Sequence, residues 1–211
     1  MNTTDAVTFW DGVYAARRAA ADPRPNRRLT ETVAGLPPGD ALDLGCGEGG
    51  DALWLARRGW HVTAVDISAV AVERLAGLAR ANGMGDRLVA QAHDLRASFP
   101  DGGFDLISAC YLHTPFDLER ATALRAAAHA LRPGGRLLVV DHGSTAPWSW
   151  NQDPGVRYPA PREVAAGIGL DPETWTIERA DAPRRDATGP GGRTGEVTDH
   201  VLLIRRTAAR R

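Results

Sequence analysis

The stretch ALDLGCGEGG, residues 41–50, places four glycines and two carboxylates in ten positions, directly after an apolar run. Gly45, Gly47 and Gly50 fit the GxGxxG pattern, in which glycines between a strand and a helix let the backbone approach a nucleotide closely. The next apolar run ends at Asp66, 21 residues after Gly45, the separation expected for a carboxylate that binds ribose hydroxyls. The alternative is a tight turn followed by an acid that caps a helix. The ordered context favours a nucleoside site.

The acid within the same stretch distinguishes between nucleoside ligands. In a dinucleotide-binding fold, the pyrophosphate lies over this turn at the helix N-terminus, where the carboxylate of Asp43 would repel it. A ligand that carries a sulfonium and an ammonium but no phosphate would be attracted, directly or through water. S-adenosylmethionine has these groups, with S-adenosylhomocysteine as its product. A nicotinamide-dependent oxidoreductase is therefore the weaker interpretation.

Composition sets limits on partners and compartment. The 211 residues carry a formal net charge of -1 and have no lysine, which argues against nucleic-acid binding and excludes Schiff-base chemistry. Cys46 and Cys110 lie in apolar runs without a Cys/His cluster, so we expect no metal and a reducing cytoplasm. The first ten residues lack an apolar core, and the longest apolar runs are strand-length. We therefore expect no export signal and no membrane span.

Strand-like and helix-like segments alternate from residue 41 onward, which predicts an α/β fold with a doubly wound, mostly parallel sheet and helices on both faces. The strands are expected at residues 41–45, 61–66, 88–93, 104–110, 136–141, 175–182 and 197–205, the last two as an antiparallel pair. The helices are expected at residues 4–21, 49–58, 68–82, 117–131 and from residue 161 to 169. Residues 183–196, rich in Gly, Pro and Arg, are expected to form a mobile loop.

The motifs in order resemble those of the class I S-adenosylmethionine-dependent methyltransferases. ALDLGCGEGG looks like motif I, followed by VTAVDIS, a third strand ending in HDL, FDLISACYLH and LRPGGRLLVV, over residues 40–143. The resemblance implies a Rossmann-like, seven-stranded sheet with an antiparallel last strand. It further implies that the methionine end is lined by Gly45, Cys46, Gly47 and Gly49, the ribose by Asp66, and the adenine by Ile67, Asp94 and Leu95. Asp43 and Cys110 are counted with this cofactor-binding set.

Each of these residues also has a simpler interpretation. Ile67 could belong to the core, and Asp94 could cap a short turn. Cys46 is better explained as a small filler than as a nucleophile, because no neighbouring cation or base in sequence would lower its pKa.

The acceptor site is expected beyond the carboxyl ends of the fourth and fifth strands. His113 and His142 lie there and could accept a proton near neutral pH, while Tyr111 could position the substrate; for each, a structural role is the alternative. Residues 144–159 form a long connection with a substrate-binding set of aromatic residues and one cation, which suggests a lid: Trp148, Trp150, Arg157 and Tyr158. The alternative is that the tryptophans anchor this segment to the core.

The N-terminal segment supplies another expected wall. Phe9, Val13, Ala16 and Ala20 form one apolar stripe, beside Trp10 and Tyr14. TFWDGVY followed by PRPNRRL resembles the small tellurite-resistance and thiopurine methyltransferase-like branch, which implies that Trp10 and Tyr14 meet the cofactor. The arginines at 17, 18, 27 and 28 would lie near the mouth or form a solvated basic face.

These observations predict one domain, residues 1–211, with a helical cap (1–38), a cofactor-binding half (39–143) and a lid with antiparallel strands (144–211). The expected reaction is in-line methyl transfer to a small-molecule nucleophile, either a soft sulfur, selenium or tellurium species or a phenol, amine or heterocycle. Detoxification and secondary-metabolite tailoring both fit, as more remotely does a catalytically silent nucleoside-binding protein. We expect a cytoplasmic monomer or weak homodimer without nucleic-acid or membrane partners.

Overall fold

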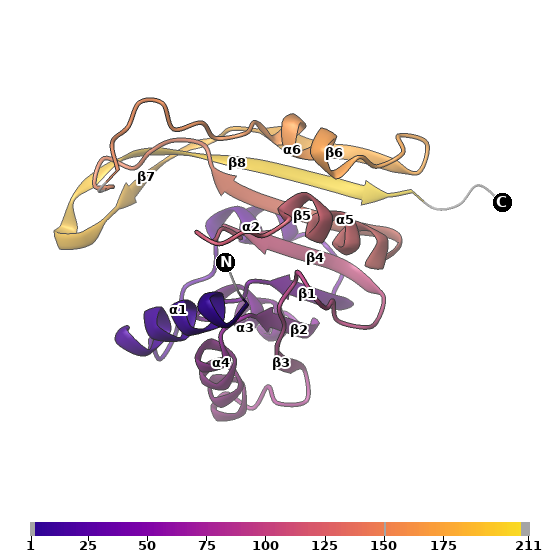
Figure 1. The fold of residues 1–211 in the computed structure, drawn as a ribbon. Helices are drawn as coiled ribbons and strands as arrows, with labels where there is room; N and C mark the ends of the chain where they lie inside the picture. The colour runs from indigo at the N-terminus through magenta and orange to yellow at the C-terminus, as the bar shows by residue number, and fades with distance from the viewer. Residues whose placement is uncertain (1–2, 150, 208–211) are drawn as a thin grey trace.

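The computed structural model describes residues 3–149 and 151–207, which form an α/β fold around one large sheet (Figure 1). The helices are α1 (Thr3–Ala16), α2 (Arg27–Val33), α3 (Gly50–Arg57), α4 (Ala69–Ala81), α5 (Arg120–Ala130), α6 (Pro161–Ile168) and the 3-10 turn η1 (Pro190–Gly192). The strands are β1 (Asp40–Leu44), β2 (His61–Asp66), β3 (Leu88–Ala92), β4 (Phe104–Cys110), β5 (Leu131–His142), β6 (Trp175–Asp181), β7 (Arg184–Thr188) and β8 (Thr194–Arg206).

The sheet has the order β3-β2-β1-β4-β5-β8-β6, and β7 pairs with β8 beyond this path. The pairs among β1 to β5 are parallel, whereas β8 runs antiparallel to β5, β6 and β7. The chain therefore reverses direction across the sheet at β1, since β2 and β3 lie on one side and β4 and β5 on the other. The predicted doubly wound fold is confirmed, and this reversal is where such sheets bind ligands.

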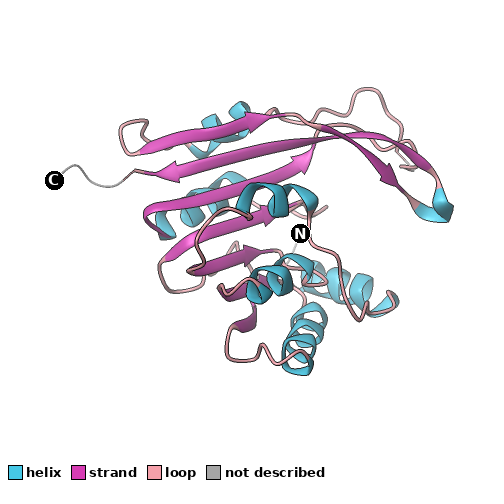
Figure 2. Cartoon of the chain, turned by 180° about the vertical axis from the view of Figure 1, so that it is seen from behind, coloured by secondary structure: helices cyan, strands magenta, loops and turns pink. Residues whose placement is uncertain are grey.

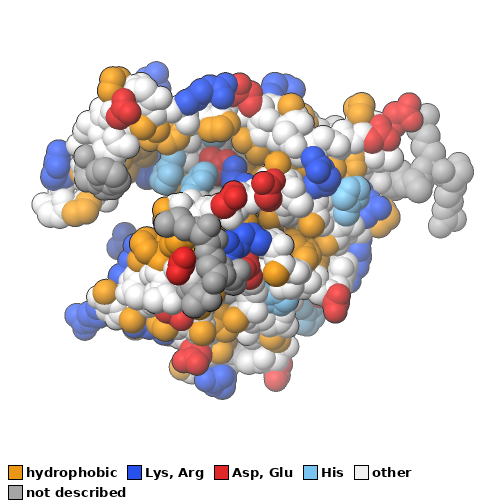
Figure 3. Space-filling model, viewed as in Figure 1, with side chains coloured by type: hydrophobic (Ala, Val, Ile, Leu, Met, Phe, Trp, Pro, Cys, Tyr) orange, Lys and Arg blue, Asp and Glu red, His pale blue; other side chains and the backbone are white. Residues whose placement is uncertain are grey.

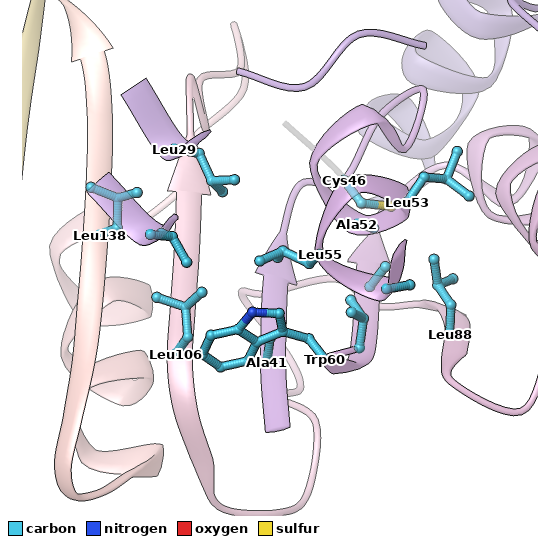
Figure 4. Packing of buried hydrophobic residues seen from close by; sticks show 14 of the residues in the cluster. Leu29, Ala41, Cys46, Ala52, Leu53, Leu55, Trp60, Leu88, Leu106 and Leu138 are labelled. Carbon is cyan, nitrogen blue, oxygen red and sulfur yellow. The ribbon is translucent and has the colours of Figure 1, made fainter. Parts of the chain in front are cut away.

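Alternating side chains along the strands build a core on each face of the sheet. On β5, Leu138 and Val140 join one cluster, while Leu137 and Val139 join the other, as the two-residue period of a strand requires. Residues of α2, α3 and α4 cover the first face, and residues of α5 and α6 cover the second (Figure 2). Figure 4 shows the Trp60 indole among Ala41, Leu55 and Leu106 in the first cluster. Helices on both faces are thus confirmed.

Local signals set the limits of α4, as the sequence predicts. The Ser68 hydroxyl accepts a hydrogen bond from the Ala71 amide at 3.2 Å, which caps the first turn. Gly83, at φ +68°, follows the helix where its C-terminal cap requires a left-handed residue. The N-terminal cap at Ser68 places the start of α4 close behind Asp66, at the edge of the candidate site.

The N-terminal region differs from the expectation. Helix α1 ends at Ala16 and turns a different face inward, since Ala6 is buried while Phe9 is 43% exposed. The predicted stripe through Phe9 is wrong, because α1 lies over α4 and the turn after β1, and Trp10 and Tyr14 face that turn. The short helix α2, which has too few residues for a periodic pattern, was not predicted.

The predicted loop at residues 183–196 is a β-hairpin, which adds an eighth strand. β7 pairs with the first residues of β8, from Arg184 opposite Thr198 to Thr188 opposite Thr194, around the turn η1. Residues 189–192 hold most of the Gly and Pro residues that suggested a loop and form this turn, whereas Gly195 pairs with Ala187 in the strands. Together β7 and residues 194–198 form the hairpin arm, which projects beyond the body of the sheet (Figure 1).

Candidate active site

A cleft lies at the carboxyl ends of β1, β2 and β4, closed on one side by α1. Counted with the space that is open to solvent, it measures about 700 Å³. Nine of the residues predicted for the site line it: Trp10, Tyr14, Gly45, Asp66, Ile67, Asp94, Leu95, Tyr111 and His113. The structure thus gathers residues from five separate segments of the chain into one cavity.

The glycine turn forms the floor of this cleft beside β1. Gly45, Gly47 and Gly49 have φ values of +68°, +51° and +84°, in the left-handed region that favours glycine. A Cβ on Gly45 would lie 2.7 Å from Leu112 Cδ1, and one on Gly47 would lie 3.0 Å from the Tyr14 hydroxyl. The turn therefore keeps open a space that any side chain at these positions would fill.

Asp66 connects this turn to the start of α4. Its Oδ2 accepts a hydrogen bond from the Gly47 amide at 2.9 Å, and its Oδ1 accepts one from the Ser68 amide at 3.0 Å. Burial raises the pKa of Asp66, against the effect of these amide hydrogen bonds. The carboxyl group thus borders the cleft in the position expected for a hydrogen-bond acceptor to a nucleoside.

A second acid, Asp43, lies beneath the turn rather than along the cleft wall. It is 2% exposed, its Oδ1 accepts from the Ser108 hydroxyl at 2.8 Å, and its Oδ2 has no hydrogen-bond partner among residues 3–149 and 151–207. Burial, and next the negative charge of Asp51, raise its pKa. A buried carboxyl oxygen without a donor is costly, and a cationic ligand above the turn would compensate for it.

The two cysteines belong to the same buried layer. Burial raises the pKa of the Cys46 thiol and that of the Cys110 thiol, and nearby carboxylates raise both further. Neither residue lines the cleft. Their environment favours neutral thiols that pack, in line with the filler interpretation of Cys46.

The far end of the cleft follows β3. Asp94 forms a bidentate ion pair with Arg96, in which both N–O distances are 2.9 Å. Leu95 lies beside it and also packs on the second core cluster. Arg96 was not singled out from the sequence, because an arginine two residues after an acid is no signal in itself.

Helix α1 is fastened over the cleft by polar contacts. The Trp10 indole donates to the Thr114 hydroxyl at 3.2 Å, and Asp11 accepts from the Ser68 hydroxyl at 2.6 Å. Arg74 donates to the carbonyl of Tyr14. Burial and the charge of Asp66 raise the pKa of Tyr14, so its phenol stays neutral. Trp10 and Tyr14 thus wall the cleft, as the N-terminal resemblance suggests.

Beyond β4 and β5 lie the candidate bases. His113 Nε2 is 3.2 Å from Asp141 Oδ1, which also accepts from Arg120 at 2.6 Å. Although burial opposes ionisation, the hydrogen bond from His113 and the charge of Arg120 lower the pKa of Asp141. His142 lies with its ring 6.0 Å from that of His113, and burial, then the charge of His113, lower its pKa. His142 itself is not among the residues that line the cleft.

Tyr111 joins these histidines to a buried ion network. Its φ of +53° is rare for a residue with a side chain and costs on the order of 1 kcal/mol. Its hydroxyl donates to Asp199 at 2.8 Å, and burial, then the charge of Asp199, raise its pKa to about 12. Tyr111 is therefore a hydrogen-bond donor and not a base.

Asp199 also pairs with Arg28 and Arg185. Arg28 is 4% exposed, so the expected solvated basic face is wrong for this residue. The sequence carried no signal for the pairing, since Arg28 and Asp199 lie 171 positions apart.

Three of the four predicted lid residues lie outside the cleft. Trp148 packs against Gly189 in the hairpin arm, Tyr158 hydrogen-bonds Thr145 at 2.9 Å, and Arg157 pairs with Glu163 on the surface. Trp150 falls outside the described residues. Figure 3 shows a hollow between the hairpin arm and the helical layer that contains α1, with histidine side chains at its inner end. The segment that was expected to form a lid therefore supports the arm that overhangs this hollow.

Comparison with known proteins agrees with this geometry. Residues 41–135 match the family model described as a methyltransferase domain. The matched stretch is therefore similar to a methyltransferase domain. It includes the glycine turn, Asp66, Asp94 and His113, whereas Asp141 and Asp199 lie after the matched residues.

Relatives of this chain include 27-O-demethylrifamycin SV methyltransferase of Amycolatopsis mediterranei, 36% identical over 141 residues, which are 63% of this chain and 49% of the relative. The chain thus matches about half of that protein. A structure solved in a study of "Conversion of a Disulfide Bond into a Thioacetal Group during Echinomycin Biosynthesis" has a TM-score of 0.70 and 25% identity, over 97% of this chain and 93% of the other.

TehB from Haemophilus influenzae, at 18% identity and a TM-score of 0.68 over 86% of this chain and 62% of its own, shares the fold. The tellurite-resistance branch remains a prediction, because this likeness extends to the fold alone. In the described part of the chain, no helix combines the length and apolar character needed to cross a membrane.

Proposed function

We propose that the chain transfers a methyl group from S-adenosylmethionine to a protic group, such as a hydroxyl, of a small molecule. The observation that carries this proposal is the buried Asp43 oxygen without a donor beneath a turn of three left-handed glycines. Such a site matches a ligand that brings positive charge and no phosphate.

The residues present fit this cofactor. The bare turn at Gly45 and Gly47 would accept its amino-acid end, with Asp43 supplying the opposing charge, and Asp66 would accept the ribose hydroxyls. Ile67 and Leu95 offer apolar surface on which the adenine can rest. When bound, the cofactor would supply an activated methyl on a sulfonium and leave as a neutral thioether.

The protein's own part is to orient the acceptor, exclude water and take its proton. We assign the proton-accepting role to His113, because it lines the cleft and its Nε2 is held by Asp141. This arrangement leaves Nδ1 for the acceptor and stabilises the charge that forms on the ring. A soft anionic nucleophile would need no such residue, so the histidine supports the protic acceptor.

A tailoring role in secondary metabolism follows from the same proposal. The relative from Amycolatopsis mediterranei is named for methylation of an oxygen in a rifamycin precursor. In this chain, residues 39–143 would serve the cofactor, and residues 144–211, with the hairpin arm, would face the acceptor.

Calorimetry and a methyl-transfer assay test the proposal. We expect binding of S-adenosylhomocysteine, no binding of NAD, and loss of binding in Asp66→Ala, with the exposed Asp101→Ala as control. Labelled methyl should pass to hydroxylated aromatic or macrocyclic compounds rather than to small thiols or tellurite. Binding of NAD alone would overturn the cofactor assignment, and transfer to thiols alone would overturn the acceptor class.

A further inference from the structure

Asp199 on β8 lies at the centre of a buried network that the proposed reaction does not use directly. It is 1% exposed, and its Oδ2 accepts from Arg28 Nε at 2.9 Å and from Arg185 Nε at 2.7 Å. Its Oδ1 accepts from the Tyr111 hydroxyl at 2.8 Å and, more weakly, from Arg185 at 3.3 Å. The carboxylate therefore uses all its acceptor positions on groups from three other elements.

The arginines fix this carboxylate to the frame of the molecule. Arg28, in α2, also donates to the carbonyls of Pro183 and Arg184 at 3.3 and 3.1 Å, at the beginning of β7. Arg185 comes from β7 itself, within the hairpin arm. Asp199 is thus held by α2 on one side and by β7 on the other, independently of the candidate site.

Tyr111 is the link from this frame to the two histidines. Its ring stacks on His142 with centroids 4.4 Å apart and planes at 17°, and its carbonyl accepts from the His113 amide at 2.8 Å. The β5–β8 register places His142 opposite Asp199. One phenol hydroxyl therefore connects the ion network to the side chain of one candidate base and the backbone of the other.

We propose that Asp199 is a positioning residue: through the Tyr111 hydroxyl it fixes the placement of His113 and His142 at the cleft. The inference rests on the proposed function for the role of the histidines. Tyr111 has a left-handed backbone conformation, with φ +53°, which residues other than glycine rarely adopt. The hydrogen bond from its hydroxyl to Asp199 helps to hold the residue in this conformation. The hairpin arm also contacts this link directly, since Arg185 of β7 donates to the Tyr111 hydroxyl at 3.4 Å.

Tyr111→Phe is the central variant, because it removes the hydroxyl and leaves the ring and both ion pairs of Asp199 in place. The 13C–1H resonances of His142 report the stack directly through the ring current of residue 111. We expect these resonances to move and kcat for methyl transfer to fall by about 10- to 100-fold, as for small displacements near a reacting centre. Affinity for S-adenosylhomocysteine should change by less than about twofold, since uniform binding is untouched.

Asp199→Asn gives the same signature with a larger loss of stability, because the half-buried Arg185 loses its charged partner and the buried Arg28 keeps only Glu31. Asp22→Asn is the control: this exposed carboxylate also pairs with an arginine, Arg57 at 2.8 Å, away from the cleft, so resonances and kcat should stay unchanged. A folded Tyr111→Phe protein with unmoved His142 resonances would overturn the proposal, even if Asp199→Asn unfolds. Absence of methyl transfer in the unmodified protein would contradict the proposed function alone, because the resonances still decide the positioning role.

Discussion

At the scale of single residues, the glycines of the turn after β1 serve different purposes. Gly45, Gly47 and Gly49 adopt left-handed backbone, whereas Gly50 is needed because a Cβ there would lie 2.2 Å from the Arg24 carbonyl oxygen. The GxGxxG pattern includes Gly50 and passes over Gly49. Pattern matching therefore finds the turn, but the reason for each glycine comes from the backbone.

Gly49→Ala should destabilise the protein by about 1–3 kcal/mol, because of its positive φ and crowding against Leu75. The new Cβ would lie 2.3 Å from Leu75 Cδ1. Gly77→Ala in α4 is the control, since nothing lies within 4 Å of its Cβ position, and it should stabilise by up to about 1 kcal/mol. Urea unfolding followed by circular dichroism measures both, and equal effects would contradict the argument.

Asp43, which we propose faces the cofactor, shows how such a group can weaken the fold that carries it. Its raised pKa means that the folded state holds the proton more tightly than the unfolded chain does. Its contribution to stability is therefore complete below the unfolded-state pKa, about 3.9, and is lost as pH rises through the folded-state pKa. Above the folded-state pKa, the ionised carboxyl is a cost that a neutral isostere removes.

Asp43→Asn should thus raise the unfolding free energy at pH 8 by on the order of 1 kcal/mol and lose this advantage near pH 4. The same change should weaken S-adenosylmethionine binding by about tenfold or more, because the opposing charge is gone. Thermal unfolding at both pH values, with calorimetry, checks the pair of effects. Asp101→Asn, on the surface, should change neither; a less stable Asp43→Asn protein at pH 8 would refute the argument.

At the scale of elements, α1 behaves as a cover tied to two neighbours. Asp11 binds the start of α4, and Trp10 binds Thr114 in the segment after β4. The cover thereby connects both halves of the reversed sheet across the cleft. Contacts of α1 with α4 and with the glycine turn determine which face of the helix is buried. The predicted apolar stripe is wrong because it was based on the periodicity of α1 alone.

Trp10→Phe should speed the release of S-adenosylhomocysteine about fivefold, because it removes one hydrogen bond worth about 1 kcal/mol and keeps the aromatic surface. Stopped-flow displacement measures the rate. Thr8→Ala, on the exposed face of α1, should leave the rate as it is. An unchanged rate in Trp10→Phe would mean that α1 is a fixed wall and not a closing one.

The hairpin arm marks the limit of prediction from element patterns. Gly189, Gly191 and Gly192 read as a loop, and the strands beside them have little apolar alternation because the arm projects from the body. Strand pairing there depends on backbone hydrogen bonds between residues 184–188 and 194–198. The hairpin of β7 and β8 therefore could not be predicted from a pattern of alternating apolar residues.

At the scale of the whole molecule, local sequence predicts the cofactor side far better than the acceptor side. The glycines between Gly45 and Gly49 and the acids at the strand ends are positioned by the strands directly before them. Their spacing in the sequence therefore predicts the site. The Arg28–Asp199–Tyr111 network joins three distant segments, and nothing in any one segment signals the others. These contacts form only once the chain has folded, so they could not be predicted from the sequence alone.

This division predicts where ligands protect the backbone from hydrogen exchange. S-adenosylhomocysteine at 100 times its Kd should stabilise the protein by about 2.7 kcal/mol, or roughly 5–10 °C in Tm. Protection should be confined to α1 and residues 45–50, 66–70, 93–96 and 111–118, because these segments border the cleft. The hairpin arm should gain protection only when an acceptor is added as well. Protection of the arm by the cofactor product alone would mean that the two sides are one site, and the assignment of residues 144–211 to the acceptor would fall.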